Sequence, residues 1–164
     1  MNWHSLIQND LSDLPTVAEA LQIAVRLLVA TLLGALVGFE RQSAGKAAGL
    51  RTHMLVSIGA ALFMVVANRM DFGPDAMSRV MQGIVTGIGF LGGGTILKLA
   101  DEHRVKGLTT AAGIWMMAAI GVAAGSGKLA TATIAAVLTF VILRVVYHLT
   151  EEVHSVHTSG NEKI

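Results

Sequence analysis

The stretch from Gln82 to Thr95 constrains the fold of this chain more than any other part of the sequence. Six of its fourteen residues are glycine, it carries no charge, and its flanks stay apolar as far as Arg79 and Lys98. In water such a run favours a loop, because glycine costs about 1 kcal/mol relative to alanine inside a helix. In lipid an unpaired backbone amide is far more costly, so the run is driven to stay helical. We expect it to be the central helix of a small membrane bundle, packed through its glycines.

Composition supports a membrane location. Of the 164 residues, 53% are hydrophobic and only 14% are charged, whereas a soluble domain carries about 25% charged residues. The charges gather between apolar runs, as in a protein that crosses the membrane several times. The net charge of +1 and the lack of a basic, aromatic-rich tract argue against nucleic acid as a partner. The absence of cysteine excludes disulfides and thiolate metal sites. The N-terminus has no basic segment, so we expect no cleavable signal peptide.

Five apolar segments are each close to the roughly 20 residues that cross a bilayer core. They predict an all-α transmembrane domain over residues 16–149, with spans at about 18–39, 51–69, 79–98, 108–124 and 129–149. Residues 1–15 place their apolar side chains on one stripe, which predicts a short interfacial amphipathic helix. Residues 150–164 are polar and are predicted to form a disordered cytoplasmic tail.

Basic residues in the connecting segments predict the orientation. One side has seven lysines and arginines: Arg41, Lys46, Arg51, Lys98, Arg104, Lys106 and Arg144. The other side has three: Arg69, Arg79 and Lys128. The N-terminus is therefore predicted outside and the C-terminus in the cytoplasm.

Arg26 stands out within the first span, on a ridge that continues through Gly34 and Gly38. A charge at this depth is costly and usually faces the bundle or water. One interpretation is that Arg26 extends to the membrane surface and packs only its aliphatic stem. The other is a buried cation paired with Asp71, Asp75 or a carbonyl of the glycine-rich helix.

The glycine-rich span allows two interpretations. Tight helix packing is one, and the predicted packing glycines are Gly34, Gly38, Gly83, Gly87, Gly89, Gly92, Gly93 and Gly94. In the other, the last three of these glycines break the helix and expose carbonyls to an ion or water path. The candidate intramembrane polar residues for such a path are Arg26, Gln82, Thr86 and Thr95.

A third set of candidate residues lies where helices meet the predicted cytoplasmic side: Glu40, Arg41, Arg51, Thr52, Thr109 and Thr110. Helix starts offer free amides and a partial positive charge. Glu40 is therefore expected to cap one of these starts or to pair with Arg51, in a structural ion-pair cluster. The alternative is a regulatory contact surface.

The residues expected for catalysis are missing. No serine–histidine pair, phosphate loop or metal-ligand cluster occupies a plausible position, and acidic residues are absent from the middle of the spans. We predict no catalytic residue, no cofactor and no resident metal, and hence no enzyme. Histidines and glutamates at 148–157 would group only if the last helix continued past the membrane, and a solvated tail is the simpler interpretation.

Four ordered motifs resemble those of the MgtC/SapB family. They are the segments at residues 38–42 (GFERQ), 49–53 (GLRTH), 87–94 (GIGFLGGG) and 107–112 (GLTTAA), followed by Trp115. The resemblance covers residues 20–145 and implies a multi-pass bacterial inner-membrane protein with five spans. It also implies a short form without the C-terminal ACT-like domain of longer members, which puts roles that depend on that domain in doubt.

The resemblance further implies a regulator of other membrane proteins, such as the proton-translocating ATP synthase, in adaptation to magnesium limitation and stress. The expected partners are membrane lipid, a second copy of the chain (most simply in a dimer) and a partner membrane protein. The alternative is an oligomeric transporter or channel for magnesium, protons or an anion.

Overall fold

The computed structural model describes residues 15–99 and 104–160. Residues 1–14, 100–103 and 161–164 fall outside the described residues. The predicted interfacial helix over residues 1–15 therefore lies almost wholly outside this range.

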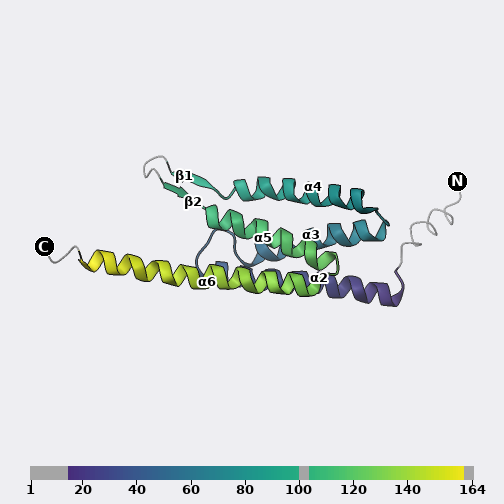
Figure 1. Ribbon diagram of the computed structural model, residues 1–164, viewed down its shortest axis with the longest axis horizontal. Coiled ribbons are helices and arrows are strands. Elements are labelled where there is room, and N and C mark those ends of the chain that lie inside the picture. The colour runs from purple at the N-terminus through teal and green to yellow at the C-terminus, as the bar shows by residue number, and fades with distance from the viewer. Residues whose placement is uncertain (1–14, 100–103, 161–164) are drawn as a thin grey trace.

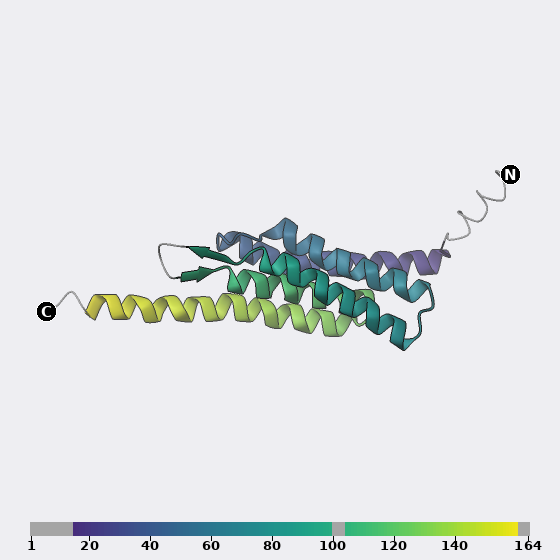
Figure 2. The same cartoon turned by 90° about the horizontal axis from the view of Figure 1, so that it is seen from above.

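Helices account for most of the described chain. Five helices run nearly parallel in an elongated bundle, and a short β-hairpin lies at one end of it (Figures 1 and 2). The elements are α2 (Val17–Ser43), α3 (Leu50–Arg69), α4 (Pro74–Gly93), β1 (Leu97–Leu99), β2 (Arg104–Lys106), α5 (Leu108–Gly125) and α6 (Leu129–Gly160). The predicted helical architecture is confirmed, with the hairpin as an addition.

Local chemistry explains where several helices begin. The Thr16 hydroxyl accepts a hydrogen bond from the Glu19 amide, and the Glu19 carboxylate accepts one from the Thr16 amide, which forms a capping box for α2. Pro74 occupies the first turn of α4, where its missing N–H costs nothing. Gly107 precedes α5 with a φ of 97°, a conformation that favours glycine.

The central helix is α5, and the prediction that the glycine-rich helix is central is wrong. α5 packs against α2, α3, α4 and α6, whereas α4 packs mainly on α5 and more sparsely on α3. Only Ile88 and Gly92 of α4 are buried. One core cluster joins α2, α3, α5 and α6, and includes Ala30, Val37, Ala61, Met117, Ile120, Ala124, Ala132 and Ala136. A smaller cluster that includes Ile88, Ile114 and Ala118 attaches α4.

The closest helix contacts depend on glycines of α2 and α5. A Cβ added at Gly121 would lie 2.2 Å from the carbonyl oxygen of Ser57, and one at Gly125 would lie 2.3 Å from that of Ala61. One turn toward the start of α3, a Cβ at Gly34 of α2 would lie 2.8 Å from the carbonyl oxygen of His53. The backbone of α3 is therefore approached by α2 and by α5 at distances that only glycine permits.

The glycine-rich helix also ends earlier than predicted. The expected span of 79–98 stops being helical at Gly93, and Leu97–Leu99 pairs antiparallel with Arg104–Lys106. Three consecutive glycines give the helix little reason to continue, and the amides of Thr95 and Ile96 bond to carbonyls only three residues back. The glycines thus end the helix instead of interrupting it.

The predicted disordered tail over residues 150–164 is also corrected. α6 continues to Gly160, because residues 129–159 contain neither glycine nor proline to stop it. Residues 161–164 are not described.

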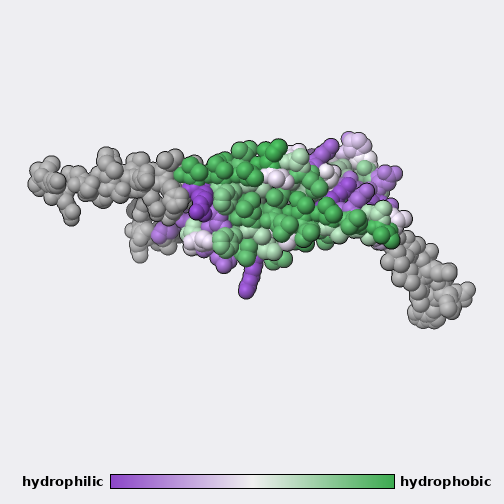
Figure 3. Space-filling view, turned by 90° about the horizontal axis from the view of Figure 1, so that it is seen from below, coloured by the Kyte–Doolittle hydropathy of each residue, from purple (hydrophilic) through white to green (hydrophobic). Residues whose placement is uncertain are grey.

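Hydropathy marks the chain as a membrane protein. Among the described residues, α2, α3 and α5 are each long and apolar enough to cross a membrane, and Leu129–Val145 of α6 is a shorter apolar stretch. In Figure 3 apolar residues dominate the middle of the molecular surface, and hydrophilic residues gather toward its two ends.

The close contact between α3 and α5 gives a first prediction. Gly121→Ala forces the α5 side chain into the Ser57 carbonyl, so it should destabilise the bundle by at least the 1–3 kcal/mol typical of overpacking. Gly89→Ala is the matched control, because nothing lies within 4 Å of its added Cβ. Thermal unfolding in detergent should show a lower midpoint for Gly121→Ala alone. Equal midpoints would contradict the helix contact.

Candidate functional site

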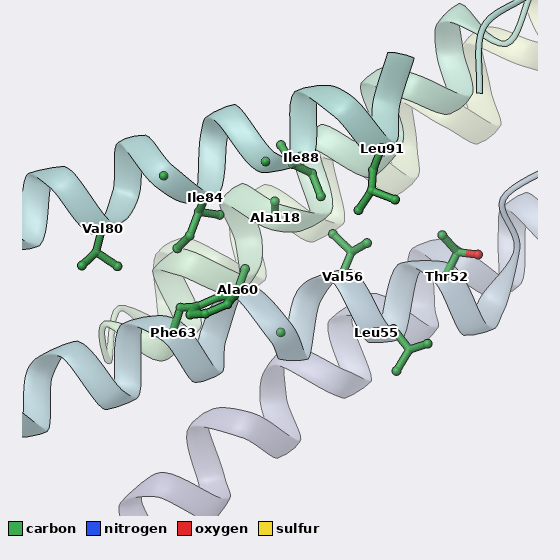
Figure 4. Close-up of a pocket in the computed structure, with 13 residues that line it drawn as sticks. Thr52, Leu55, Val56, Ala60, Phe63, Val80, Ile84, Ile88, Leu91 and Ala118 are labelled. Carbon is green, nitrogen blue, oxygen red and sulfur yellow. The ribbon is translucent and has the colours of Figure 1, made fainter. Parts of the chain in front are cut away.

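A large groove lies between α3 and α4. Its volume is about 810 Å³, and Ala118 of α5 lies at its back (Figure 4). From α3 it is lined by Thr52, Leu55, Val56, Gly59, Ala60 and Phe63, and from α4 by Val80, Gly83, Ile84, Gly87, Ile88 and Leu91. Both sets follow the same spacing over three helical turns, so each helix presents one continuous face.

Bare backbone lies along this groove. No other atom lies within 4 Å of a Cβ built at Gly59, Gly83 or Gly87. Ile84, Ile88 and Val56 point into the space between the helices, and Thr52 is the one polar side chain at the wall (Figure 4). The groove therefore suits an apolar occupant that makes close van der Waals contact, such as a helix.

The eight predicted packing glycines divide into two groups. Gly34 and Gly38 meet the backbone of α3, and a Cβ built at Gly92 would lie 3.6 Å from the Ala111 carbonyl oxygen of α5. The other five do not touch a neighbouring helix in this chain: Gly83, Gly87, Gly89 and Gly93 have open space, and Gly94 contacts only the last turn of α4. Sequence reasoning missed Gly113, Gly121 and Gly125, which are buried in α5.

The candidate path residues of α4 do not face a common cavity. Gln82 and Thr86 are exposed, and the Thr86 hydroxyl donates to the Gln82 carbonyl at 2.9 Å. Thr95 lies beyond the helix, where its hydroxyl donates to the Gly92 carbonyl at 2.8 Å. Thr95 and Gly94 line a smaller cavity of about 250 Å³ that adjoins the groove and shares Thr52, Val56 and Leu91 with it.

Arg26 lies on the far side of the bundle from the groove. Its Nη1 donates to the carbonyl of Gly125 at 3.2 Å. The partner is thus a carbonyl, as one interpretation expects, but it belongs to α5 and not to the glycine-rich helix. No ion pair joins Arg26 to Asp71 or Asp75 within the described chain. The four candidate path residues therefore do not meet in one place.

A buried ion pair forms at the hairpin end of α2. Glu40 and Arg41 are 6% and 2% exposed, and Arg41 donates to both carboxylate oxygens of Glu40, at 2.7 Å from Nη2. Arg41 also donates to the Leu143 carbonyl of α6 at 3.2 Å. The expected partner Arg51 is exposed, so the prediction that Glu40 pairs with it or caps a helix start is corrected.

The remaining motif threonines are spread over different surroundings. Thr52 lines the groove, Thr109 is exposed, and Thr110 is buried at 5% exposure. Two of the six motif residues, Glu40 and Arg41, therefore form a buried ion pair. The other four do not join it in one cluster.

His53 and Ser57 were not among the predicted site residues. Both are fully buried, one turn apart on α3. His53 Nδ1 lies 2.9 Å from the Gly49 carbonyl, and because a carbonyl oxygen only accepts, Nδ1 is the donor in this contact. Within the described chain, His53 Nε2 and Ser57 Oγ have no hydrogen-bond partner. A histidine inside an apolar helix is the sequence signal for this polar ridge.

Two arrangements that would support metal binding or acyl transfer are not found among the described residues. They contain no group of three or more His, Cys, Asp or Glu side chains that could hold a metal ion. His53 and Ser57 make no hydrogen bond to each other there, so they lack the nucleophile–base contact of a catalytic pair.

The ion pair gives a second prediction. Glu40→Gln leaves the buried Arg41 charge uncompensated and should cost about 3–5 kcal/mol of stability. The double variant Glu40→Gln/Arg41→Met removes both charges and should lose less. Thermal unfolding of the three proteins in detergent measures this order. If the double variant were less stable than Glu40→Gln, an unpaired Arg41 charge could not be the cause of the loss in the single variant.

Comparisons with known proteins complete the description of the site. Residues 27–152 match the MgtC family. The chain is 40% identical over 136 residues to "Putative magnesium transporter YhiD" of Escherichia coli K12, which covers 79% of this chain and 62% of that protein. It is 44% identical over 118 residues to protein SrpB of Synechococcus elongatus, which covers 65% of each.

A third relative, protein MgtC of Brucella abortus, is 45% identical over 119 residues, which cover 73% of this chain and 49% of the relative. The chain thus spans about half to two thirds of the length of these relatives. No solved structure matches it. The matched residues include all of α3, α4 and α5 and hence the groove. This chain belongs to the MgtC family.

Proposed function

We propose that this protein is a non-enzymatic regulator that binds a transmembrane helix of another membrane protein in the groove between α3 and α4. The observation that carries the proposal is the groove itself, which is apolar and lined by three glycines with no neighbour of their own. Such a surface lets a partner backbone approach closely, which is the main source of helix association in lipid.

The shape of the groove favours a different protein over a second copy at this face. A two-fold dimer brings the same surface of each copy together. Two concave grooves do not fill each other, whereas one helix fits a groove that spans Val80 to Leu91, about 16 Å at 1.5 Å per residue. The sequence predicts a homodimer through the small-residue faces, and under this proposal such a dimer uses a face other than the groove.

We propose that all five helices cross the bacterial inner membrane, with the N-terminus outside and the β-hairpin on the cytoplasmic side. The excess of lysine and arginine at the hairpin end supports this orientation. α4 starts at Pro74 and includes Asp75, Arg79 and Gln82 in its first half. This half of α4 is less apolar than the other helices. In the proposed arrangement the partner helix packs against α4 and so allows it to cross the membrane.

The family relationship supports a regulatory role in adaptation to magnesium limitation, and the relative named as a magnesium transporter supports the link to magnesium. A proton-translocating ATP synthase is one candidate partner by family analogy. The basic connections at the hairpin end would lie against anionic lipid headgroups.

The third prediction tests the groove. Gly87→Leu fills it with a side chain and should abolish capture of the partner, while membrane insertion and abundance stay unchanged. Gly89→Leu is the matched control, because Gly89 lies on the same helix, has open space around it and does not line the groove. The measurement is photo-crosslinking from position 55 in native membranes, followed by affinity purification and mass spectrometry.

The proposal is supported if position 55 crosslinks to an apolar helix of one membrane protein. This crosslink must form in wild type and in Gly89→Leu, and it must be lost in Gly87→Leu. Crosslinks only to lipid, or to a second copy of this chain, would contradict the proposal. An unchanged crosslink in Gly87→Leu would do so as well.

Transport is the second candidate, because one relative is named a magnesium transporter. Magnesium prefers carboxylate and water oxygens, and the groove lining contains no charged residue. Gln82 and Thr86 face outward from the single chain, so a path lined by them requires an oligomer.

The fourth prediction separates the two candidates. Purified protein in liposomes should give magnesium and proton flux no higher than liposomes without protein, measured with dyes inside the vesicles. Flux above this background that disappears in Arg26→Ala or Gln82→Ala would make transport the function instead.

A further inference from the structure

A further cavity lies at the end of the bundle opposite the hairpin, between the first turns of α2 and the last turn of α3. Its volume is about 340 Å³, and it is lined by Glu19, Gln22, Ile23, Arg26, Val65, Asn68 and Arg69. Five of these seven residues are polar or charged. The cavity therefore differs chemically from the apolar groove, and the proposed function does not use it.

The guanidinium of Arg26 is fixed from one side by the turn between α5 and α6. Its Nη1 donates to the Gly125 carbonyl at 3.2 Å, and a Cβ built at Gly127 would lie 3.0 Å from Nη2. Guanidinium has five N–H donors. The described chain supplies one hydrogen-bond acceptor for them and no carboxylate in an ion pair.

A half-buried cation without a counter-ion is unfavourable within a membrane helix. The acid in this cavity does not provide one for Arg26. The Glu19 carboxylate accepts a hydrogen bond from the Thr16 amide at 2.8 Å, and Arg69 interacts with it electrostatically. With two arginines and one glutamate, the cavity keeps a formal charge of +1.

We propose that this cavity binds a phosphate group, with Arg26 as its main ligand. The planar guanidinium matches phosphate oxygens in a two-point contact, and the side-chain amides of Gln22 and Asn68 add donors around it. The phosphate comes from the headgroup of an anionic lipid or from free inorganic phosphate. Exposed apolar side chains beside the cavity, Leu21 and Val66, suit acyl chains of a lipid.

The fifth prediction tests this site on delipidated full-length protein in a neutral detergent. Phosphatidylglycerol, phosphatidylcholine or inorganic phosphate is titrated separately, and binding is followed by native mass spectrometry and by the shift in thermal midpoint. Arg26→Gln should weaken phosphatidylglycerol binding about tenfold or more, the usual effect of losing a charged hydrogen bond. Arg79→Gln is the control, because it removes an exposed arginine that does not line the cavity.

Asn68→Leu is a second variant that fills the cavity and leaves Arg26 in place, so a folding defect of Arg26→Gln cannot decide the result. Loss in both cavity variants but not in Arg79→Gln supports the site. If only phosphatidylglycerol stabilises the protein, the ligand is a lipid headgroup. If inorganic phosphate stabilises it as well, the phosphate anion is sufficient for binding. Equal binding of phosphatidylglycerol and phosphatidylcholine, or equal loss in Arg79→Gln, would overturn the proposal.

Discussion

The close approach of α3 to its two neighbours is the constraint on which this structure depends. Glycines of α2 meet the α3 backbone near His53, and Gly121 and Gly125 of α5 meet it near Ser57 and Ala61. Because glycine adds no side chain at these contacts, the three helices pack as one compact unit. Since that unit already satisfies α2, α3 and α5, the less apolar α4 lies at the edge, and a groove remains between it and α3.

The groove and the cavity around Arg26 follow from this arrangement, and their linings differ in chemistry. The groove exposes apolar side chains and bare backbone along three turns of two helices. The cavity around Arg26 lies at the opposite end of the bundle from the hairpin and gathers charge. The buried Glu40–Arg41 pair ties α2 to α6 at the hairpin end, at the other end of the bundle from the Arg26 cavity. The proposed helix-binding surface and the proposed anion site lie in different parts of the bundle, so the two proposals allow a lipid and a partner protein to bind at the same time.

The sequence predicted the helical membrane fold and the family, because apolar length and ordered motifs are local properties. It could not predict which glycines pack within the chain. Gly87 and Gly121 both lie in apolar helices, yet one faces open space and the other faces a backbone carbonyl at 2.2 Å from its built Cβ. That difference arises only when the helices assemble. The pairing of Glu40 with Arg41 was missed for a similar reason, since adjacent helical residues do not normally face each other, and His53 becomes an internal polar group only between α2 and α5.

The exposure of the groove to lipid in native membranes tests the central claim most directly. The chain contains no cysteine, so a spin label on Leu91→Cys, which lines the groove, can be compared with one on Leu32→Cys, which is similarly exposed on α2. Collisions with oxygen dissolved in the lipid report on each label. A partner helix in the groove predicts that Leu91→Cys is shielded in native membranes but not in pure lipid, while Leu32→Cys is accessible in both. Equal oxygen access at position 91 in native membranes and in pure lipid would contradict it.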